Sequence, residues 1–214
     1  MRYIAKGKEP ASLLAHRKNK EADYANLPKK AKNDLRKALL KEQGYVCCYC
    51  MQRIREDNSK IEHWKPQKHT RFQLNYQNLL AACQGNEGEK KDRQHCDTHK
   101  GEQEITINPT DKTRNCELFI KYRKNGLICS DDPVINEELN TVLNLNTQTL
   151  AENRAVIMDY VKNEITRVKG KNSAWPIPYV RKIIQKYGSR HNEKFIPYCQ
   201  VVIYFLKKRF KNEL

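Results

Sequence analysis

The sequence predicts a mainly α-helical protein that holds one small metal-organised module between helical additions at the N-terminal and C-terminal ends. Two observations favour this fold. Apolar residues recur at helical spacing in both outer parts, whereas residues 47–112 are irregular and rich in Cys, His, Asn and Gly. At 214 residues the chain can bury one core of ordinary size. We therefore divide it into a basic helical segment (1–44), the module (45–112) and a C-terminal region (113–214).

The N-terminal region predicts two helices. Residues 10–25 look helical and polar. In the following run PKKAKNDLRKALLKEQG, one helical face carries the apolar residues Ala31, Leu35, Ala38 and Leu39. Pro28 stands at the start of this second helix and Gly44 just past its end, where these residue types are favoured. The second helix therefore delivers the chain directly to the cysteine-rich module.

The C-terminal region predicts a hairpin followed by helices. ELFIKYRKNGLICS alternates around Asn125-Gly126, which is a strong signal for a two-residue turn. Residues 136–168 and 178–187 have helical periodicity, and FIPYCQVVIYFLKKRF is typical of a final apolar helix that ends in basic residues. We interpret this region as the partner-binding part of the protein.

Charge is unevenly distributed along the chain, whose net charge is +16. Residues 1–44 carry 12 basic and 5 acidic side chains (+7), and residues 166–214 carry 12 and 2 (+10). Residues 130–165 carry 2 and 7 (−5). Basic ends indicate a polyanion partner such as nucleic acid, and the acidic middle indicates a protein partner. The alternative is that these charges only solvate helix faces.

The start of the chain, MRYIAKGKEP, has no apolar run of signal-peptide length, and no later stretch approaches the roughly 20 apolar residues of a membrane span. We therefore expect a cytoplasmic protein with no membrane partner. In a reducing compartment the eight cysteines are not expected to form a disulfide framework, so metal binding becomes the leading interpretation of the clustered ones.

Four cysteines have the pattern of a structural zinc site. Cys47-x-x-Cys50 has the spacing of a zinc knuckle, and Cys83 and Cys96 supply the two further ligands of a tetrahedral site. The polar insertion QGNEGEKKDRQH between the second two cysteines should loop out. Cys48 could replace Cys47, and buried thiols without a metal are the alternative. The remaining cysteines, Cys116, Cys129 and Cys199, lie in apolar surroundings and are predicted core residues.

Three short motifs lie among these cysteines: IEHWKP (61–66), NYQNLL (75–80) and CDTHKG (96–101). In this order, with the CxxC pair before them, they resemble the HNH endonuclease family in its zinc-stapled form. The resemblance implies a small ββα-metal module that hydrolyses DNA phosphodiester bonds with magnesium or another divalent cation. It covers roughly residues 45–101.

The resemblance also implies roles for individual residues. His63 matches the catalytic histidine, Glu62 the acidic metal ligand before it, and Asn78 the motif asparagine, for which Asn75 is a competitor. The position after the fourth cysteine, normally His or Asn, is Asp97 here, and His99 competes with it for the role of last metal ligand. Further contacts to nucleic acid are expected from Lys65, His69 and Lys100.

The chemistry of phosphodiester cleavage fits these residue types. Magnesium prefers oxygen ligands, which Glu62 and the side-chain oxygens of Asn78 or Asp97 can supply. His63 can take a proton from water near neutral pH, and the Asn78 amide oxygen could orient its ring. Adjacent strand residues point to opposite sides, so Glu62 and His63 can share a pocket only where the strand bends or ends.

Beyond this module the chain resembles the PtuB family in its basic N-terminal segment beginning MRYIAKGKEP, the helix before CCYC, the wide spacing of Cys83 and Cys96, and its helical tail. The PtuB proteins are the HNH nuclease subunits of Septu-type and some retron anti-phage defence systems. The resemblance implies an effector nuclease that forms a hetero-oligomer with the ATPase subunit PtuA, which is similar to structural-maintenance-of-chromosomes (SMC) ATPases. Two other functions stay open: a non-catalytic zinc-dependent nucleic-acid-binding module, and an RNA-cleaving HNH toxin.

Overall fold

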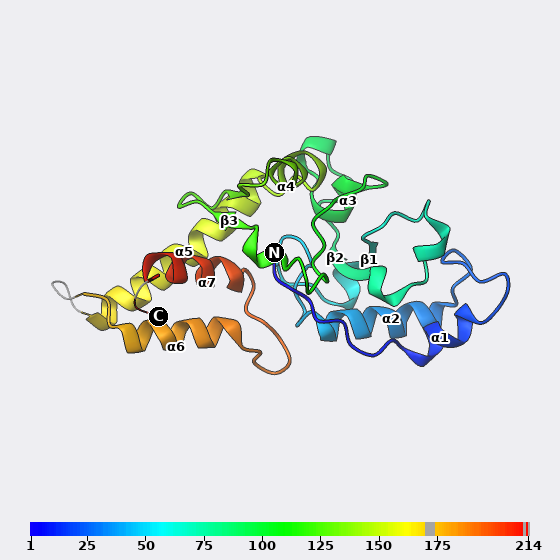
Figure 1. The fold of residues 1–214 in the computed structure, drawn as a ribbon, viewed down its shortest axis with the longest axis horizontal. Helices are drawn as coiled ribbons and strands as arrows, with labels where there is room; N and C mark the ends of the chain where they lie inside the picture. Colours follow the sequence, from blue (N-terminus) through cyan, green and yellow to red (C-terminus); the bar gives the residue numbers. More distant parts are fainter. Residues whose placement is uncertain (170–173, 212, 214) are drawn as a thin grey trace.

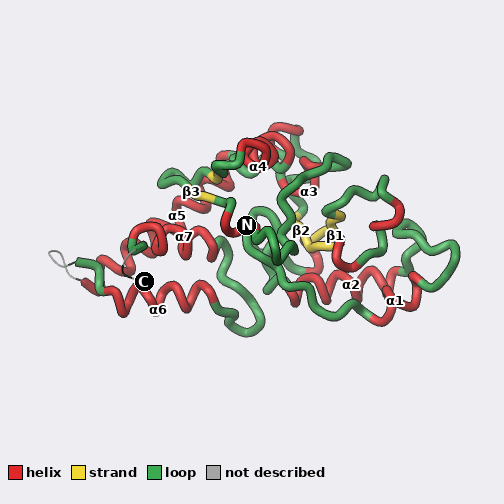
Figure 2. The backbone as a smooth tube through the Cα atoms, in the orientation of Figure 1, coloured by secondary structure: helices red, strands yellow, loops and turns green. Residues whose placement is uncertain are grey.

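The computed structural model describes residues 1–169, 174–211 and 213 (Figure 1). Its α-helices are α1 (Ala11–Arg17), α2 (Lys29–Glu42), α3 (Cys96–Lys100), α4 (Pro133–Glu137), α5 (Gln148–Lys169), α6 (Ile177–Gly188) and α7 (Cys199–Arg209). The strands are β1 (Ser59–His63), β2 (Leu79–Cys83), β3 (Lys121–Tyr122) and β4 (Ile128–Cys129). Short 3-10 turns lie at Glu56–Asn58, Thr70–Phe72, Tyr76–Asn78, Lys91–Arg93 and Cys116–Leu118. Helices dominate, and the strands of the described residues form two small two-stranded sheets, so the mainly α prediction is confirmed (Figure 2).

Helix α2 forms as the sequence predicts. Its predicted apolar face is buried, with Leu35 and Leu39 both 0% exposed. Its end leads into Gln43, a buried side chain whose amide donates to the Ala81 carbonyl (2.8 Å) and accepts from the Ala81 amide (2.7 Å). Gln43 thereby pairs with β2 as a strand would, and it fixes the end of α2 against the sheet of the module.

Helix α1 is shorter than the predicted 10–25 and ends at Arg17. Beyond it, Asp23 and Asn26 each accept a hydrogen bond from the other's backbone amide, at 2.7 and 3.0 Å. Such local side-chain bonds compete with helical hydrogen bonding. The chain therefore forms a turn here and runs over the module before α2 begins.

Strands β1 and β2 pair antiparallel, with Ser59 opposite Cys83 and His63 opposite Leu79. All five residues of β2 are buried, because α2 covers this sheet and α3 packs against it. This arrangement places the end of β1, with Glu62 and His63, next to the first turn of α3. In Figure 1 the two strands lie between α2 and α3.

The hairpin β3–β4 forms at the predicted position, but its turn has three residues (124–126) and not the two expected. The Gly126 amide donates to the Arg123 carbonyl (2.9 Å), and the Arg123 amide donates to the Leu127 carbonyl (2.8 Å). The buried Arg154 of α5 ties the turn down, because its guanidinium donates to the Gly126 carbonyl and to the Leu145 carbonyl. The hairpin is therefore held by a helix that follows it in sequence.

The predicted helix over 136–168 is interrupted, which corrects the sequence-based expectation. It consists of α4, a π-helical turn (Glu138–Val142) and α5. Between them Asn144 adopts φ +46° and donates to the Asp92 and Gln94 carbonyls, while the Leu143 carbonyl accepts the Cys96 amide (2.8 Å). Contacts with the loop before α3 therefore break the helix.

Helix α7 packs on both α5 and α6, and the three helices form the left part of the molecule in Figure 1. Helix α6 matches the predicted 178–187, whereas α7 starts at Cys199, four residues after the predicted start. The segment before α7 is bonded to the module instead, through Phe195 N–H to the Gly44 carbonyl (2.9 Å) and Tyr198 N–H to the Met51 carbonyl (3.1 Å).

Parts of the predicted region 113–214, namely 170–173, 212 and 214, lie outside the described residues. The division at residues 44 and 112 stays a prediction, although the segment 195–198 packs on the module. Among the described helices, none combines the length and the apolar character that crossing a bilayer requires.

Candidate functional site

The CxxC segment forms a tight turn that directs both sulfurs to one side. The Met51 amide donates to the Cys47 carbonyl (3.1 Å), and the Cys47 amide donates to the Gln52 carbonyl (3.0 Å). Met51 adopts φ +67°, a left-handed conformation that costs a non-glycine residue energy and that the surrounding fold must maintain. The Cys83 amide also donates to the Cys47 sulfur (3.4 Å), which ties β2 to the turn.

The four predicted cysteines come together. Their sulfur atoms all lie within 4.8 Å of one another and all four residues are buried. The Cys47–Cys96 sulfur distance is 3.9 Å and the Cys50–Cys83 distance is 3.8 Å. Four sulfurs at the usual Zn–S distance of about 2.3 Å stand about 3.8 Å apart in a tetrahedron. The cluster therefore has the size and the donors to bind a structural metal such as zinc.

The insertion between Cys83 and Cys96 loops out, as predicted, and its ends are pinned together. Gly85 adopts φ +58°, and its carbonyl accepts the His95 amide (3.1 Å). A Cβ on Gly85 would stand 2.1 Å from the His95 carbonyl oxygen, so only glycine fits this closure. The Nδ1 atom of His95 lies 3.2 Å from the Cys96 sulfur and 3.9 Å from the Cys83 sulfur, so the ring can stabilise both.

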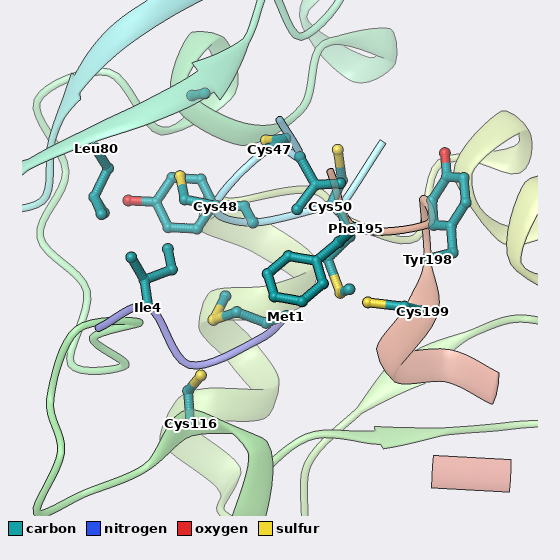
Figure 3. Close-up of a cluster of buried hydrophobic side chains, with 14 of the residues drawn as sticks. Met1, Ile4, Cys47, Cys48, Cys50, Leu80, Cys116, Phe195, Tyr198 and Cys199 are labelled. Atoms are coloured by element: carbon teal, nitrogen blue, oxygen red, sulfur yellow. The ribbon is translucent and has the colours of Figure 1, made fainter. Parts of the chain in front are cut away.

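The other cysteines stand outside this group. Figure 3 shows Cys48 beside Cys47 and Cys50, with Cys116 and Cys199 in the apolar core around Met1. Burial raises the pKa of Cys48 well above its ordinary value, so the group stays a neutral thiol. Cys116 and Cys199 are fully buried as expected, whereas Cys129 is only half-buried on β4.

Glu62 is a buried carboxylate (2% exposed) whose oxygens are both engaged. Oε1 accepts the Tyr49 hydroxyl (2.6 Å) and lies 3.0 Å from the Lys100 ammonium, and Oε2 accepts the His63 amide (2.9 Å). Burial raises the pKa of Glu62 well above its ordinary value, and the neighbouring Asp97 carboxyl raises it further. Two carboxyl groups close together favour a proton or a cation between them.

Helix α3 presents Asp97 and Lys100 to Glu62 from successive turns. Asp97 is half-exposed and thus extends the carboxylate pair to the surface. Lys100 is 1% exposed, and its ammonium also donates to the His63 carbonyl (3.0 Å). This burial corrects the expectation that Lys100 contacts phosphate. The side chain instead compensates charge inside the site, because a buried carboxylate requires a partner.

His63 is the last residue of β1, so the strand ends at the Glu62-His63 pair. Such an ending is what allows both side chains to share one pocket. Its Nε2 lies 3.0 Å from the Gln73 carbonyl, and Tyr24 packs edge-on against the ring at a centroid distance of 4.5 Å. A carbonyl can only accept, so the Nε2 proton is fixed and Nδ1 is left as the acceptor. Burial lowers the pKa of His63, which keeps the ring neutral at neutral pH.

Asn78 supports the loop between β1 and β2. Its Oδ1 accepts the Lys65 amide (2.7 Å), and its Nδ2 donates to the carbonyls of Lys65 (2.9 Å) and Phe72 (3.2 Å). These bonds differ from the expectation that its amide oxygen orients the His63 ring, since the Gln73 carbonyl does so. Asn75 caps the adjacent 3-10 turn through the Gln77 amide (3.0 Å).

The remaining predicted residues lie around this centre. The Nδ1 atom of His99 bonds to the Val142 carbonyl (2.9 Å), whereas Asp97 neighbours Glu62. Which of the two is the last metal ligand stays a prediction. Lys65 and His69 both pair with the exposed Glu104, at 2.9 and 2.8 Å. The hydrogen bonds from Lys65 and His69 lower the pKa of Glu104 to about 2.

Sequence reasoning missed Tyr49, Gln73, Tyr24 and His95. Tyr49 lies inside the CxxC motif, where the tight turn directs its hydroxyl to Glu62. Gln73 acts through its backbone carbonyl, which no residue pattern encodes. Tyr24 comes from the segment after α1, and its amide donates to the Gln73 side chain (3.1 Å). Only the position of His95 directly before Cys96 could have pointed to a role.

Comparison with known proteins identifies no family: no family model matches the chain, and no curated protein matches it.

Proposed function

We propose that the chain is a metal-dependent endonuclease of the HNH family that hydrolyses DNA phosphodiester bonds. One observation carries the proposal: the hydrogen-bonded, neutral His63 ends the strand whose buried Glu62 pairs with Lys100 of α3 and neighbours Asp97. The succession β1, β2 and α3 around the cysteine cluster supports the finer proposal of a ββα-metal module.

Glu62 and Asp97 are the residues that would hold a catalytic magnesium or other divalent cation. Both offer carboxylate oxygens, the donors that such hard cations prefer, and two neighbouring carboxyl groups favour a positive charge beside them. When bound, the cation would neutralise charge on the phosphate and stabilise the leaving oxygen. The protein itself places one cation beside these two carboxyl groups, because the Lys100 ammonium lies 3.0 Å from Glu62 Oε1.

His63 would act as the general base. Its Nε2 proton is held by the Gln73 carbonyl, so Nδ1 can accept a proton from a water molecule. The water oxygen then forms a bond to phosphorus, the opposite P–O bond breaks, and the leaving oxygen takes a proton from solvent. Tyr24 and Gln73 keep the ring in the orientation that this transfer needs.

Nicking of supercoiled plasmid tests the proposal. We expect cleavage with added magnesium and none after dialysis into magnesium-free buffer; a chelator is avoided because it can also remove zinc from the cysteines. His63→Ala should abolish cleavage while zinc content and melting temperature stay near wild type, because a general base acts in the transition state. His191→Ala, an exposed histidine, is the matched control.

The outcomes separate the alternatives. Wild-type protein that binds zinc and DNA but never cleaves would be a non-catalytic zinc-dependent binding module. Cleavage of an RNA of the same sequence, with plasmid left intact, would identify an RNA-cleaving enzyme. If His63→Ala melts far below wild type, the histidine is structural and the assigned role fails.

We further propose that the nuclease is the effector of an anti-phage defence system, in a complex with an SMC-like ATPase subunit similar to PtuA. Two apolar side chains one turn apart on α5, Val156 (67% exposed) and Tyr160 (57% exposed), support a docking face there. The paired substitutions Val156→Asp and Tyr160→Asp should abolish co-purification with the product of a neighbouring ATPase gene. Val134→Asp, at another exposed position, should not.

These point variants are preferable to deletion of 130–214. The deletion would also remove Leu143, whose carbonyl accepts the Cys96 amide, and would thereby disturb the metal cluster. Retention of the partner by the double variant would contradict docking through α5.

A further inference from the structure

A groove outside the cysteine and histidine site has the composition of a nucleic-acid-binding surface. It has a volume of about 690 Å³ and lies between the hairpin β3–β4 and helix α7, with Met158 of α5 at its base. These elements pack directly on one another, in the part of Figure 1 where β3 lies above α7. Neither Glu62, His63 nor any of the four clustered cysteines lines it.

Both walls of the groove are basic. Lys121, Arg123 and Lys124 come from the hairpin, and Lys208 and Arg209 come from the last turn of α7. The one acidic lining residue, Asp131, pairs with Lys121. The other four cations form no ion pair within the described residues. The groove therefore carries a net charge of +4 (five cations less one carboxylate) along two facing edges.

Aromatic rings line the same groove. Tyr204 and Phe205 line the groove and are each partly exposed. The Tyr204 ring is held in place by Tyr122, at a centroid distance of 5.6 Å, and the Lys208 ammonium lies 5.7 Å from its centroid. Fixed rings flanked by cations are the arrangement on which unpaired bases stack while their phosphates meet Lys and Arg.

We propose that this groove binds a single-stranded segment of nucleic acid. In a duplex the base faces are covered by their stacked neighbours, so a duplex could bind the cations through its phosphates but could not stack on the rings. A single strand can do both. The proposal does not depend on nuclease activity. If the chain is also a nuclease, the groove would hold part of the substrate away from the reacting bond.

Binding of a fluorescent 15-nucleotide oligothymidylate, without added magnesium and in both wild-type and His63→Ala protein, tests the groove separately from cleavage. The triple variant Arg123→Ala, Lys124→Ala and Lys208→Ala should reduce the slope of log K against log salt by about 2, at about 0.7 for each phosphate that the variant no longer neutralises. A triple variant on α6, Arg181→Ala, Lys182→Ala and Lys186→Ala, removes the same charge elsewhere and should leave the slope unchanged.

The aromatic part of the proposal has its own test. Tyr204→Leu keeps an apolar side chain but removes the stacking face, so it should weaken oligothymidylate binding about tenfold. It should leave binding of heparin, a polyanion without bases, unchanged. Tyr179→Leu, at a half-buried tyrosine of α6, is the matched control and should change neither.

Three results would overturn the proposal. The first is an equal reduction of the slope of log K against log salt in the α6 variant, which would show that the slope depends on the net charge of the protein and not on the groove. The second is a Tyr204→Leu variant that binds oligothymidylate as tightly as wild type does. The third is a matched duplex that loses as much affinity as the single strand in Tyr204→Leu, which would show that no base stacks on the ring.

Discussion

The two antiparallel hairpins of this protein differ in length and in how far their polar side chains are buried. Sheet β1–β2 has five residue pairs, and its strands are joined by a long loop that the buried Asn78 side chain fixes. Sheet β3–β4 has two pairs and turns at residues 124–126, and its neighbouring cations are exposed. Buried side chains from other segments anchor both hairpins: Gln43 pairs with β2, and Arg154 of α5 bonds to the Gly126 carbonyl in the turn of β3–β4. The hairpins differ in what they present, because Glu62 and His63 of β1 are buried whereas Arg123 and Lys124 beside β3 are exposed.

The burial of these polar side chains determines which chemical role each hairpin can have. The buried polar groups of β1–β2 are fixed in position, as a reacting centre requires. The exposed cations of β3–β4 can reach a flexible ligand but do not define one geometry. Substitutions at matched positions in the two hairpins should therefore differ widely in their effect on stability.

The largest effect is expected from the cysteine cluster. Cys50→Ser should lose about one zinc per chain and unfold the module, because structural zinc contributes about 10–16 kcal/mol in small sites, more than a typical domain's net stability. Metal analysis and circular dichroism measure both. Cys129→Ser on β4 should keep zinc and melt close to wild type. Folded, metal-free wild-type protein would contradict the zinc interpretation.

The next effect compares two lysine–carboxylate pairs. Lys100→Met leaves Glu62 buried beside Asp97 without its cation, which should cost about 3–5 kcal/mol in urea unfolding at neutral pH. Lys121→Met breaks the exposed pair with Asp131 and should change the unfolding midpoint little, because water already solvates both groups. Equal unfolding midpoints for the two variants would show that the buried pair stabilises the fold no more than the exposed pair does.

Asparagine substitutions sharpen the same comparison. Asn78→Ala leaves the Lys65 amide and two loop carbonyls without partners, so a loss of about 2–3 kcal/mol is expected. Asn125→Ala removes only one exposed bond, to the Leu127 amide at 3.3 Å. Hydrogen exchange should show faster exchange over residues 64–78 in Asn78→Ala alone, and its absence would contradict the role of Asn78 as a loop support.

The smallest of these effects is expected at the turn of β3–β4. Gly126 adopts φ +80°, and a Cβ there would stand 1.9 Å from the Ala151 carbonyl oxygen. Gly126→Ala should therefore cost about 2 kcal/mol and move the turn away from α5. Gly88→Ala, also at positive φ but with open space around it, separates the backbone contribution from the clash. Identical melting of the two variants would mean that no clash occurs.

Several features of this protein were determined by the sequence alone. Helix α2, the position of the hairpin β3–β4 and the gathering of Cys47, Cys50, Cys83 and Cys96 follow from periodicity, turn chemistry and ligand spacing. These signals are readable because each depends on a few neighbouring residues or on one chemical type. The function assigned to His63 and Glu62 stays a proposal that the tests above address.

Only the tertiary structure decided the details of the candidate site. Lys100 follows a charged motif and was expected at the surface, but α3 turns it toward Glu62, where a buried carboxylate needs a cation. Asn78 serves the loop and the Gln73 carbonyl holds His63, because backbone groups brought together by folding compete for side-chain partners. Likewise, the helix predicted over 136–168 breaks at Asn144 because its bonds to the loop before α3 replace helical ones. Periodicity cannot record such contacts, since their partners are distant in sequence.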